Sequence, residues 1–262
     1  MPVAFLPDLR LHYLDHGPRN GPALVLSHPV GLNLTVWDAV IPLLPPSLRV
    51  IRYDHRGHGG SDTPPAPYAM GALVRDAERL LDHLGVRDCV FLGLSMGGLV
   101  AQGLAVKRLD QVRALILSNT AAKIGYQSHW QARIDEVRGQ GLIPDVDDTM
   151  KRLLSRTFLA GDKAVQWRDV LQGCQVEGWL GCAAAIAGTD FYTPTAGLTL
   201  PSLVIASSND AVTPPDLVRE TADLIRGSRF HLIRGPGHLP CVETPDAYAA
   251  LIIGFLHRIG HL

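Results

Sequence analysis

Apolar and amphipathic segments alternate along most of this 262-residue chain. Short apolar runs rich in β-branched residues are typical of strands, and apolar residues at helical spacing are typical of helices. We expect strands at 10–16, 23–27, 50–54, 90–94, 112–118, 202–206 and 230–233. We expect helices at 70–84, 96–108 and 245–259, and an amphipathic stretch at 35–44. This alternation predicts a mainly parallel sheet with helices on both faces.

Residues 121–195 interrupt the alternation. They contain four segments with helical character, at 128–138, 146–157, 163–171 and 176–186, and no convincing strand. Because no flexible linker flanks the segment, a separately folding domain is the weaker interpretation. We therefore predict a core formed by 1–120 and 196–262, with 121–195 as a helical cap over it.

The composition allows a large core and excludes several classes of partner. Hydrophobic residues make up 47% of the chain and charged residues 19%, which excludes wholesale disorder. The net charge of −1 provides no electrostatic attraction to nucleic acid or to a membrane surface. The uncharged run 89–106 has the length of a membrane span, but glycines and a serine cluster at its centre. We therefore reject a membrane span.

The cysteines and the first residues indicate a cytoplasmic location. The four cysteines show no C-x-x-C and no close spacing, as expected of reduced and mostly buried thiols. The N-terminal residues lack a basic segment followed by an apolar one, so they do not have the pattern of a secretory signal.

A nucleophile motif lies between the expected strand 90–94 and the expected helix 96–108. Gly93-Leu94-Ser95-Met96-Gly97 has the order G-x-S-x-G, in which a serine occupies a tight strand-to-helix turn. The small glycines allow a strained backbone and close packing of the strand on the helix. The sequence therefore predicts Ser95 as a catalytic nucleophile.

A serine nucleophile needs a base, and the base needs a group that orients it. Asp210 and His238 each follow an expected strand, in the chain order serine, acid, histidine that is typical of such sites. Asp190 and Asp216 are alternative acids, but the first lies in the helical insertion and the second at the start of a helix. We predict a triad of Ser95, Asp210 and His238.

Acyl transfer also needs hydrogen-bond donors for the developing oxyanion. The residue after the nucleophile, Met96, is expected to provide one backbone N–H. The second is expected from the loop after the strand 23–27, where Pro29 has no N–H and Val30 is therefore the candidate donor. We expect His28 to pack beneath this loop.

His28, His55 and His58 are the residues that raise the question of a metal. No carboxylate or thiolate set accompanies them at ligand spacing, so we interpret them as structural. The glycine-rich stretch 54–61 lacks the order and the helix of a dinucleotide site, and we expect its Asp54 and Arg56 to support the active site from below. We predict neither a metal nor an organic cofactor.

These motifs together resemble the α/β-hydrolase superfamily. The similarity rests on Gly93-x-Ser95-x-Gly97, on Asp54-x-Arg56-Gly57-x-Gly59-x-Ser61, on Asp210 and on Gly237-His238. Within that superfamily the chain is similar to 3-oxoadipate enol-lactonases. The more specific pieces are the run from Asn119 to Gly125, Trp130 with Arg133, and Glu177-Gly178 with Cys182 and Ala185-Ile186.

The resemblance implies a substrate that carries a carboxylate, and therefore a pocket with an apolar wall and a cation. Trp130 and Arg133 lie three residues apart on an expected helix and share a face, so they are the candidates for substrate binding. Arginine can bind both oxygens of a carboxylate. The alternative is that Trp130 belongs to a local core and that Arg133 pairs with Glu136 at the surface.

The resemblance implies hydrolysis of an enol-lactone to 3-oxoadipate through an acyl-enzyme. The nearer alternative is a carboxylesterase, another lactonase or a perhydrolase that uses the same triad. The more distant alternative is a non-catalytic receptor on a hydrolase fold, against which the complete triad argues. In every enzymatic alternative the partner is a small ester or lactone.

Overall fold

The computed structural model describes residues 2–142 and 146–262, and its centre is an eight-stranded sheet. The strand order is β1-β2-β4-β3-β5-β6-β7-β8. β1 and β2 run antiparallel to their neighbours, and the other strands are parallel. The strands are β1 (Val3–Leu6), β2 (Leu9–His16), β3 (Ala23–Ser27), β4 (Arg49–Tyr53), β5 (Cys89–Leu94), β6 (Val112–Ser118), β7 (Ser202–Ser207) and β8 (Arg229–Ile233).

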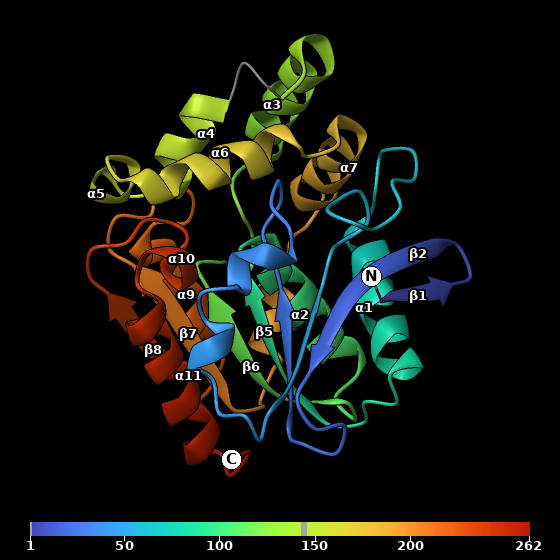
Figure 1. Ribbon diagram of the computed structural model, residues 1–262, viewed down its shortest axis with the longest axis vertical. Coiled ribbons are helices and arrows are strands. Elements are labelled where there is room, and N and C mark those ends of the chain that lie inside the picture. Colours follow the sequence, from blue (N-terminus) through green and yellow to red (C-terminus); the bar gives the residue numbers. More distant parts are fainter. Residues whose placement is uncertain (1, 143–145) are drawn as a thin grey trace.

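Helices cover both faces of this sheet (Figure 1). α1 (Met70–His83), α2 (Met96–Lys107) and α9 (Pro215–Leu224) pack on one face. The other face carries α10 (Pro240–Glu243), α11 (Pro245–Arg258) and the 3-10 helices η1 (Leu34–Trp37) and η2 (Ile41–Leu43). Successive residues of β5 alternate between the two cores: Phe91 faces α2, and Leu92 belongs to the opposite cluster. This burial on both faces explains the nearly continuous apolar runs.

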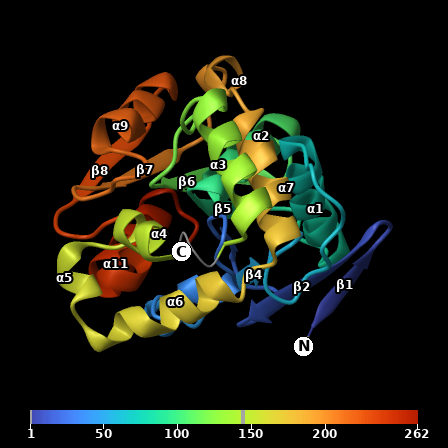
Figure 2. The ribbon, with the colours of Figure 1, turned by 90° about the horizontal axis from the view of Figure 1, so that it is seen from above.

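Most of the remaining helices lie beyond the carboxyl ends of the parallel strands, as Figures 1 and 2 show. They are α3 (Gln127–Gln140), α4 (Val146–Leu153), α5 (Arg156–Leu159), η4 (Asp162–Ala164), α6 (Val165–Gln172) and α7 (Val176–Ala187). The short helix α8 (Tyr192–Ala196) packs beside α2 and α9 instead. α3, α7 and Leu142 form a small core of their own, whose other members are Ile134, Val137, Trp179, Leu180 and Ala183. In open α/β sheets this end is where ligands bind.

The main elements agree with the predicted order, and the differences have local causes. β1 is missing from the prediction because it has only four residues and is defined by its pairing with β2. Residues 35–44 form two short 3-10 helices rather than one amphipathic element. The expected helix 146–157 is divided, because the Ser155 side chain accepts the Phe158 N–H and starts α5 anew.

The uncharged run 89–106 is β5 followed by α2, in agreement with the rejection of a membrane span. None of the helices in the described parts of the chain combines the length and apolar content that a membrane crossing requires.

Two glycines bring α7 into direct contact with the loop after β4. A Cβ atom on Gly178 would lie 1.9 Å from the Gly57 carbonyl oxygen, and one on Gly57 would lie 2.2 Å from the Gly178 Cα. Gly57 also has φ +77°, which favours glycine. Nearby, the Glu177 carboxylate accepts the Ala66 N–H at 2.7 Å. α7 is therefore held against the sheet region by backbone contact.

This contact predicts that Gly178→Ala destabilises the protein. The added methyl group has to displace backbone, so we expect the free energy of unfolding to fall by about 2 kcal/mol. Gly139→Ala in α3 is the matched control, because a Cβ there meets none of the described atoms within 4 Å. Its expected effect is a gain of about 0.5–1 kcal/mol. Urea unfolding of both variants measures the difference, and an equal effect of the two would contradict the assignment.

Candidate active site

Ser95 occupies a strained turn between β5 and α2. Its φ of 57° and ψ of −119° lie in a region that side chains rarely adopt. Backbone contacts impose this conformation: the Ser95 N–H donates to the Ser118 carbonyl at 3.0 Å. A Cβ on Gly93 would lie 2.1 Å from the Gly97 oxygen, and one on Gly97 would lie 2.1 Å from the Ser27 oxygen. The two glycines of the motif are therefore required by close approach.

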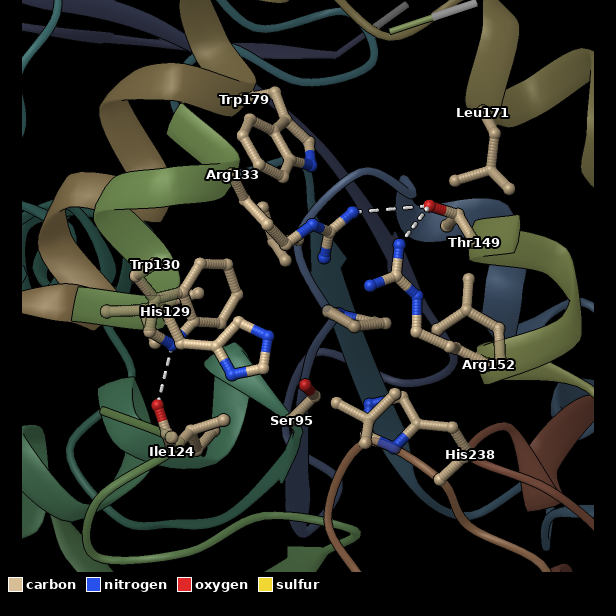
Figure 3. A pocket seen from close by; sticks show the side chains of 17 residues that line it. Ser95, Ile124, His129, Trp130, Arg133, Thr149, Arg152, Leu171, Trp179 and His238 are labelled. Carbon is tan, nitrogen blue, oxygen red and sulfur yellow. Dashed lines mark hydrogen bonds between the residues drawn. The ribbon is translucent and has the colours of Figure 1, made fainter. Parts of the chain in front are cut away.

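The turn directs the Ser95 side chain into a cavity, while α2 begins at the next residue (Figure 3). Met96 is the first residue of α2, so its N–H has no acceptor within the helix. The positive end of the helix dipole also points towards this position. The start of α2 can therefore stabilise negative charge beside the Ser95 hydroxyl.

Asp210 and His238, from the loops after β7 and β8, are in direct contact. His238 Nδ1 lies 2.9 Å from Asp210 Oδ2, and both residues are buried. Because Nδ1 faces the carboxylate, Nε2 is the ring nitrogen available to the cavity that His238 and Ser95 both line. The carboxylate can therefore hold the imidazole in the tautomer that a general base needs.

Several donors keep the Asp210 carboxylate ionised. Asn119 Nδ2 donates to Oδ2 at 2.8 Å, and the Thr213 hydroxyl donates to the same oxygen at 2.7 Å. The N–H groups of Val212 and Thr213 donate to Oδ1 at 2.8 and 3.0 Å. Burial alone would raise the pKa of Asp210, but the His238 ring and these donors outweigh it, and the net pKa is lowered.

The loop after β3 is held from below by neutral imidazoles. His28 Nδ1 donates to the Pro29 carbonyl at 2.7 Å, and its Nε2 accepts the His55 N–H at 3.0 Å. His58 Nε2 accepts the Gly31 N–H at 2.9 Å. Since Pro29 has no N–H and that of Gly31 is used, Val30 is the residue in this turn whose N–H can face the cavity.

Burial explains why these imidazoles stay uncharged. It is the largest cause that lowers the pKa of His28 well below its usual value, and His55 and His58 add to the effect. Burial also lowers the pKa of His58, and that of His55 to about 3. In the described residues, no group of three or more His, Cys, Asp or Glu side chains is arranged to hold a metal ion.

A cavity of about 180 Å³ connects the predicted residues (Figure 3). Ser95 and His238 form part of its lining at the sheet end, and α3, α4 and α7 contribute side chains from above. Its full lining is Pro29, Val30, Ser95, Ile124, Gly125, His129, Trp130, Arg133, Thr149, Arg152, Leu153, Leu171, Trp179, Ile186, Ala211, Val212 and His238.

Two arginines from different helices line this cavity. The Arg133 guanidinium lies 5.2 Å from the centre of the Trp179 ring and donates to the Thr149 hydroxyl at 3.3 Å. Arg152 lies 3.5 Å from the same hydroxyl (Figure 3). Trp130 Nε1 donates to the Ile124 carbonyl at 2.7 Å, and this contact orients the indole that lines the wall. The cavity therefore combines aromatic surface with positive charge.

The comparisons with known proteins agree with this geometry. The family model of the alpha/beta hydrolase fold matches residues 22–245. The chain belongs to the α/β-hydrolase family. It is 35% identical to 3-oxoadipate enol-lactonase 2 of Acinetobacter baylyi, over 97% of this chain and 95% of the relative.

Solved structures extend the similarity. The enol-lactonase of Burkholderia xenovorans LB400 is 33% identical and has a TM-score of 0.94, covering 98% of this chain and all of that one. A thermophilic esterase of Thermogutta terrifontis is 29% identical with a TM-score of 0.90, covering 98% of this chain and 97% of that one. The protein is therefore an α/β-hydrolase that resembles enol-lactonases.

The structure brings together all seven residues that the sequence analysis predicted for the site of this hydrolase. Ser95, His238, Val30, Trp130 and Arg133 line the cavity, Asp210 contacts His238, and Met96 follows Ser95 at the start of α2. The rejected acids lie elsewhere. Asp190 pairs with Lys123 at 3.0 Å, and Asp216 is in the first turn of α9.

Sequence reasoning missed four contributors to this site: Asn119, Thr149, Arg152 and Thr213. Asn119 directly follows β6, the neighbour of β5, and this position was the available signal. Thr213 lies in the loop two residues before α9, which begins at Pro215, and its hydroxyl donates to Asp210. No sequence pattern indicated Thr149 or Arg152.

Thr213→Val removes a hydrogen bond to the Asp210 carboxylate, so we expect it to lower the free energy of unfolding by an amount that depends on pH. A group with a lowered folded-state pKa contributes stability that is present above its unfolded pKa and is lost as the pH falls through the folded value. Removing the hydroxyl should cost about 2 kcal/mol of unfolding free energy at pH 7. The deficit should shrink as the pH falls below about 4, near the ordinary carboxyl pKa.

Thr244→Val is the matched control for this experiment. The Thr244 hydroxyl donates to the uncharged Pro240 carbonyl at 3.2 Å, so its loss should change stability equally at both pH values. Denaturant unfolding at pH 7 and at about pH 2.5 gives the comparison, because the lower pH has to lie well below the ordinary carboxyl pKa. A deficit in Thr213→Val that is the same at the two pH values would contradict a charged acceptor.

Proposed function

We propose that this hydrolase opens 3-oxoadipate enol-lactone to 3-oxoadipate through an acyl-enzyme. The observation that carries the proposal is the strained Ser95, whose side chain shares a cavity with the Asp210-oriented His238. The enol-lactonase names of relatives with 35% and 30% identity support this choice of lactone.

In the proposed reaction, His238 Nε2 takes the proton of the Ser95 hydroxyl as Oγ attacks the lactone carbonyl. The Met96 and Val30 N–H groups donate to the tetrahedral oxyanion. The ring C–O bond then breaks, and the enol oxygen leaves with the proton from His238. Water activated by His238 frees the acid and regenerates Ser95.

The leaving group makes this ring opening less demanding than ordinary ester hydrolysis. An enolate is less basic than an alkoxide, so its departure asks less of the general acid. The released enol can tautomerise to the ketone. The His238 ring and the hydrogen-bond donors around Asp210 keep its carboxylate ionised in spite of burial, so it can stabilise the imidazolium that forms during each step.

The substrate carboxylate is proposed to bind at Arg133, and the same argument extends to Arg152. Both guanidiniums line the cavity and approach the Thr149 hydroxyl from different helices. Arginine is suited to a planar carboxylate. Trp130 and Trp179, whose ring centres are 6.4 Å apart, supply the apolar wall. Residues 121–195 are accordingly proposed to act as a cap that selects the substrate above the core 1–120 and 196–262.

Turnover of freshly generated 3-oxoadipate enol-lactone tests the proposal. Ser95→Ala should lower kcat by more than about 10⁴-fold, because the nucleophile is lost. Ser207→Ala is the control: Ser207 is also a buried serine at the end of a parallel strand, and its hydroxyl has no hydrogen-bond partner among the described residues. This variant should retain activity.

Two results of this experiment would overturn the substrate assignment. The first is the absence of Ser95-dependent turnover of the enol-lactone. The second is a short p-nitrophenyl ester hydrolysed with a higher kcat/KM than the enol-lactone, which would favour a carboxylesterase.

The arginines predict selectivity for an anionic substrate. Arg133→Met and Arg152→Met should each raise the KM for the carboxylated lactone about 10- to 100-fold, the value of a charge-assisted hydrogen bond. The kcat/KM for an uncharged p-nitrophenyl ester should change by less than about threefold, because that ester has no carboxylate for the arginines to bind. Arg138→Met is the control, because Arg138 is on the same helix as Arg133 and is largely exposed. It should change neither the KM for the lactone nor hydrolysis of the ester. An equal loss with both substrates would contradict carboxylate binding.

A further inference from the structure

The backbone of His238 is hydrogen-bonded to helix α4. The His238 N–H donates to the Leu153 carbonyl at 2.8 Å. Leu153 is the last residue of α4. Its carbonyl oxygen therefore accepts no hydrogen bond from an N–H of that helix. Leu153 also lines the cavity, as do Thr149 and Arg152 of the same helix. One helix thus contacts both the cavity and the backbone of the imidazole.

A single carboxylate, that of Glu243, connects the two chain segments that meet here. Glu243 Oε1 accepts the Gly237 N–H at 2.8 Å. The two carboxylate oxygens each lie 3.2 Å from the Ser155 N–H, at the junction between α4 and α5. Glu243 itself ends α10, the short helix that follows the histidine loop. The side chain therefore bridges the loop before His238 and the segment after α4.

Ser208 and Asn209 hold the backbone of the first two residues of the histidine loop, and Glu243 holds the Gly237 N–H that follows them. The loop reads Gly235-Pro236-Gly237-His238, and Gly235 has φ +110°. Gly237 is in direct contact with the α4–α5 junction: a Cβ there would lie 2.9 Å from the Leu153 oxygen and from the Ser155 nitrogen. The Asp210 contact orients the imidazole through Nδ1, but it does not hold the loop backbone.

We propose that Glu243 is a positioning residue that holds the His238 backbone against α4. Through this link, the α4 side chains that line the cavity and the Nε2 atom of His238 keep a defined relative position. A substrate bound against Thr149 and Arg152 then lies at a defined position relative to His238 Nε2. The inference rests on the proposed role of His238, and it concerns where the imidazole stands rather than which lactone is cleaved.

The test uses reactions that require Ser95 and His238 but not the enol-lactone. We would measure the rate at which a fluorophosphonate labels Ser95, together with kcat and KM for p-nitrophenyl acetate. The variants are Glu243→Gln, which keeps the size and one acceptor oxygen, and Glu243→Ala, which removes the bridge. Asp246→Asn is the control, since it removes the same charge from an exposed side chain three residues further on.

Displacing a catalytic group by about 1 Å can cost about 100-fold in rate, so we expect Glu243→Ala to lower labelling and kcat about 10- to 100-fold. Glu243→Gln should lower both about 3- to 10-fold, because only one of its two terminal groups can accept an N–H. KM should stay within about twofold in both variants, since Glu243 does not line the cavity. Asp246→Asn should match the wild type.

Rates are expressed per folded protein, which is determined by unfolding of the same samples. Variants that lose stability but keep the wild-type labelling rate would overturn the positioning role, as would an equal loss in Asp246→Asn. If Glu243→Ala fails to fold, Glu243→Gln decides by the same criterion. A wild-type protein that the fluorophosphonate does not label would instead overturn the proposed function, and the positioning role with it.

Discussion

The site depends on one close approach of backbones, at the turn between β5 and α2. Gly93, Gly97 and the Ser27 carbonyl come so near that no Cβ fits between them, and Ser95 is held at a φ of 57°. Such a conformation persists only where the surrounding structure imposes it. Parallel pairing of β3, β5 and β6 supplies that structure. Everything else in the cavity is placed relative to this fixed turn.

Burial acts in opposite directions on the ionisable groups around the turn. For His28, His55 and His58 burial outweighs the other causes, including the Asp54 charge that acts on His28 and His58, so they stay neutral and can hold loop backbones through defined tautomers. Asp210 is also buried, but the His238 ring and four hydrogen bonds from neighbouring residues reverse the effect of burial. The imidazoles beneath the loop after β3 are therefore neutral, whereas the Asp210 carboxylate is charged.

The helices above the sheet determine what reaches Ser95. α7 is held on the sheet region by the Gly57–Gly178 contact, and α4 is hydrogen-bonded to the His238 backbone. The arginines and tryptophans of α3, α4 and α7 therefore project from elements with defined positions. Rigid support of this kind is what a precise binding site requires.

The sequence alone predicted every strand except β1, together with the nucleophile motif around Ser95, because strand periodicity, glycine spacing and proline are local properties. It also indicated Asp210 and His238, since parallel strands bring their carboxyl ends to one edge. It could not indicate Arg152 beside Arg133, the Thr213 hydroxyl on Asp210, or Glu243 between two loops. Thr213 is only three residues from Asp210, and the conformation of the loop before α9 turns its hydroxyl to the carboxylate. Arg133 and Arg152 lie on different helices, and Glu243 reaches Ser155 from 88 residues away, so only the packing of helices over the sheet decides that these side chains meet.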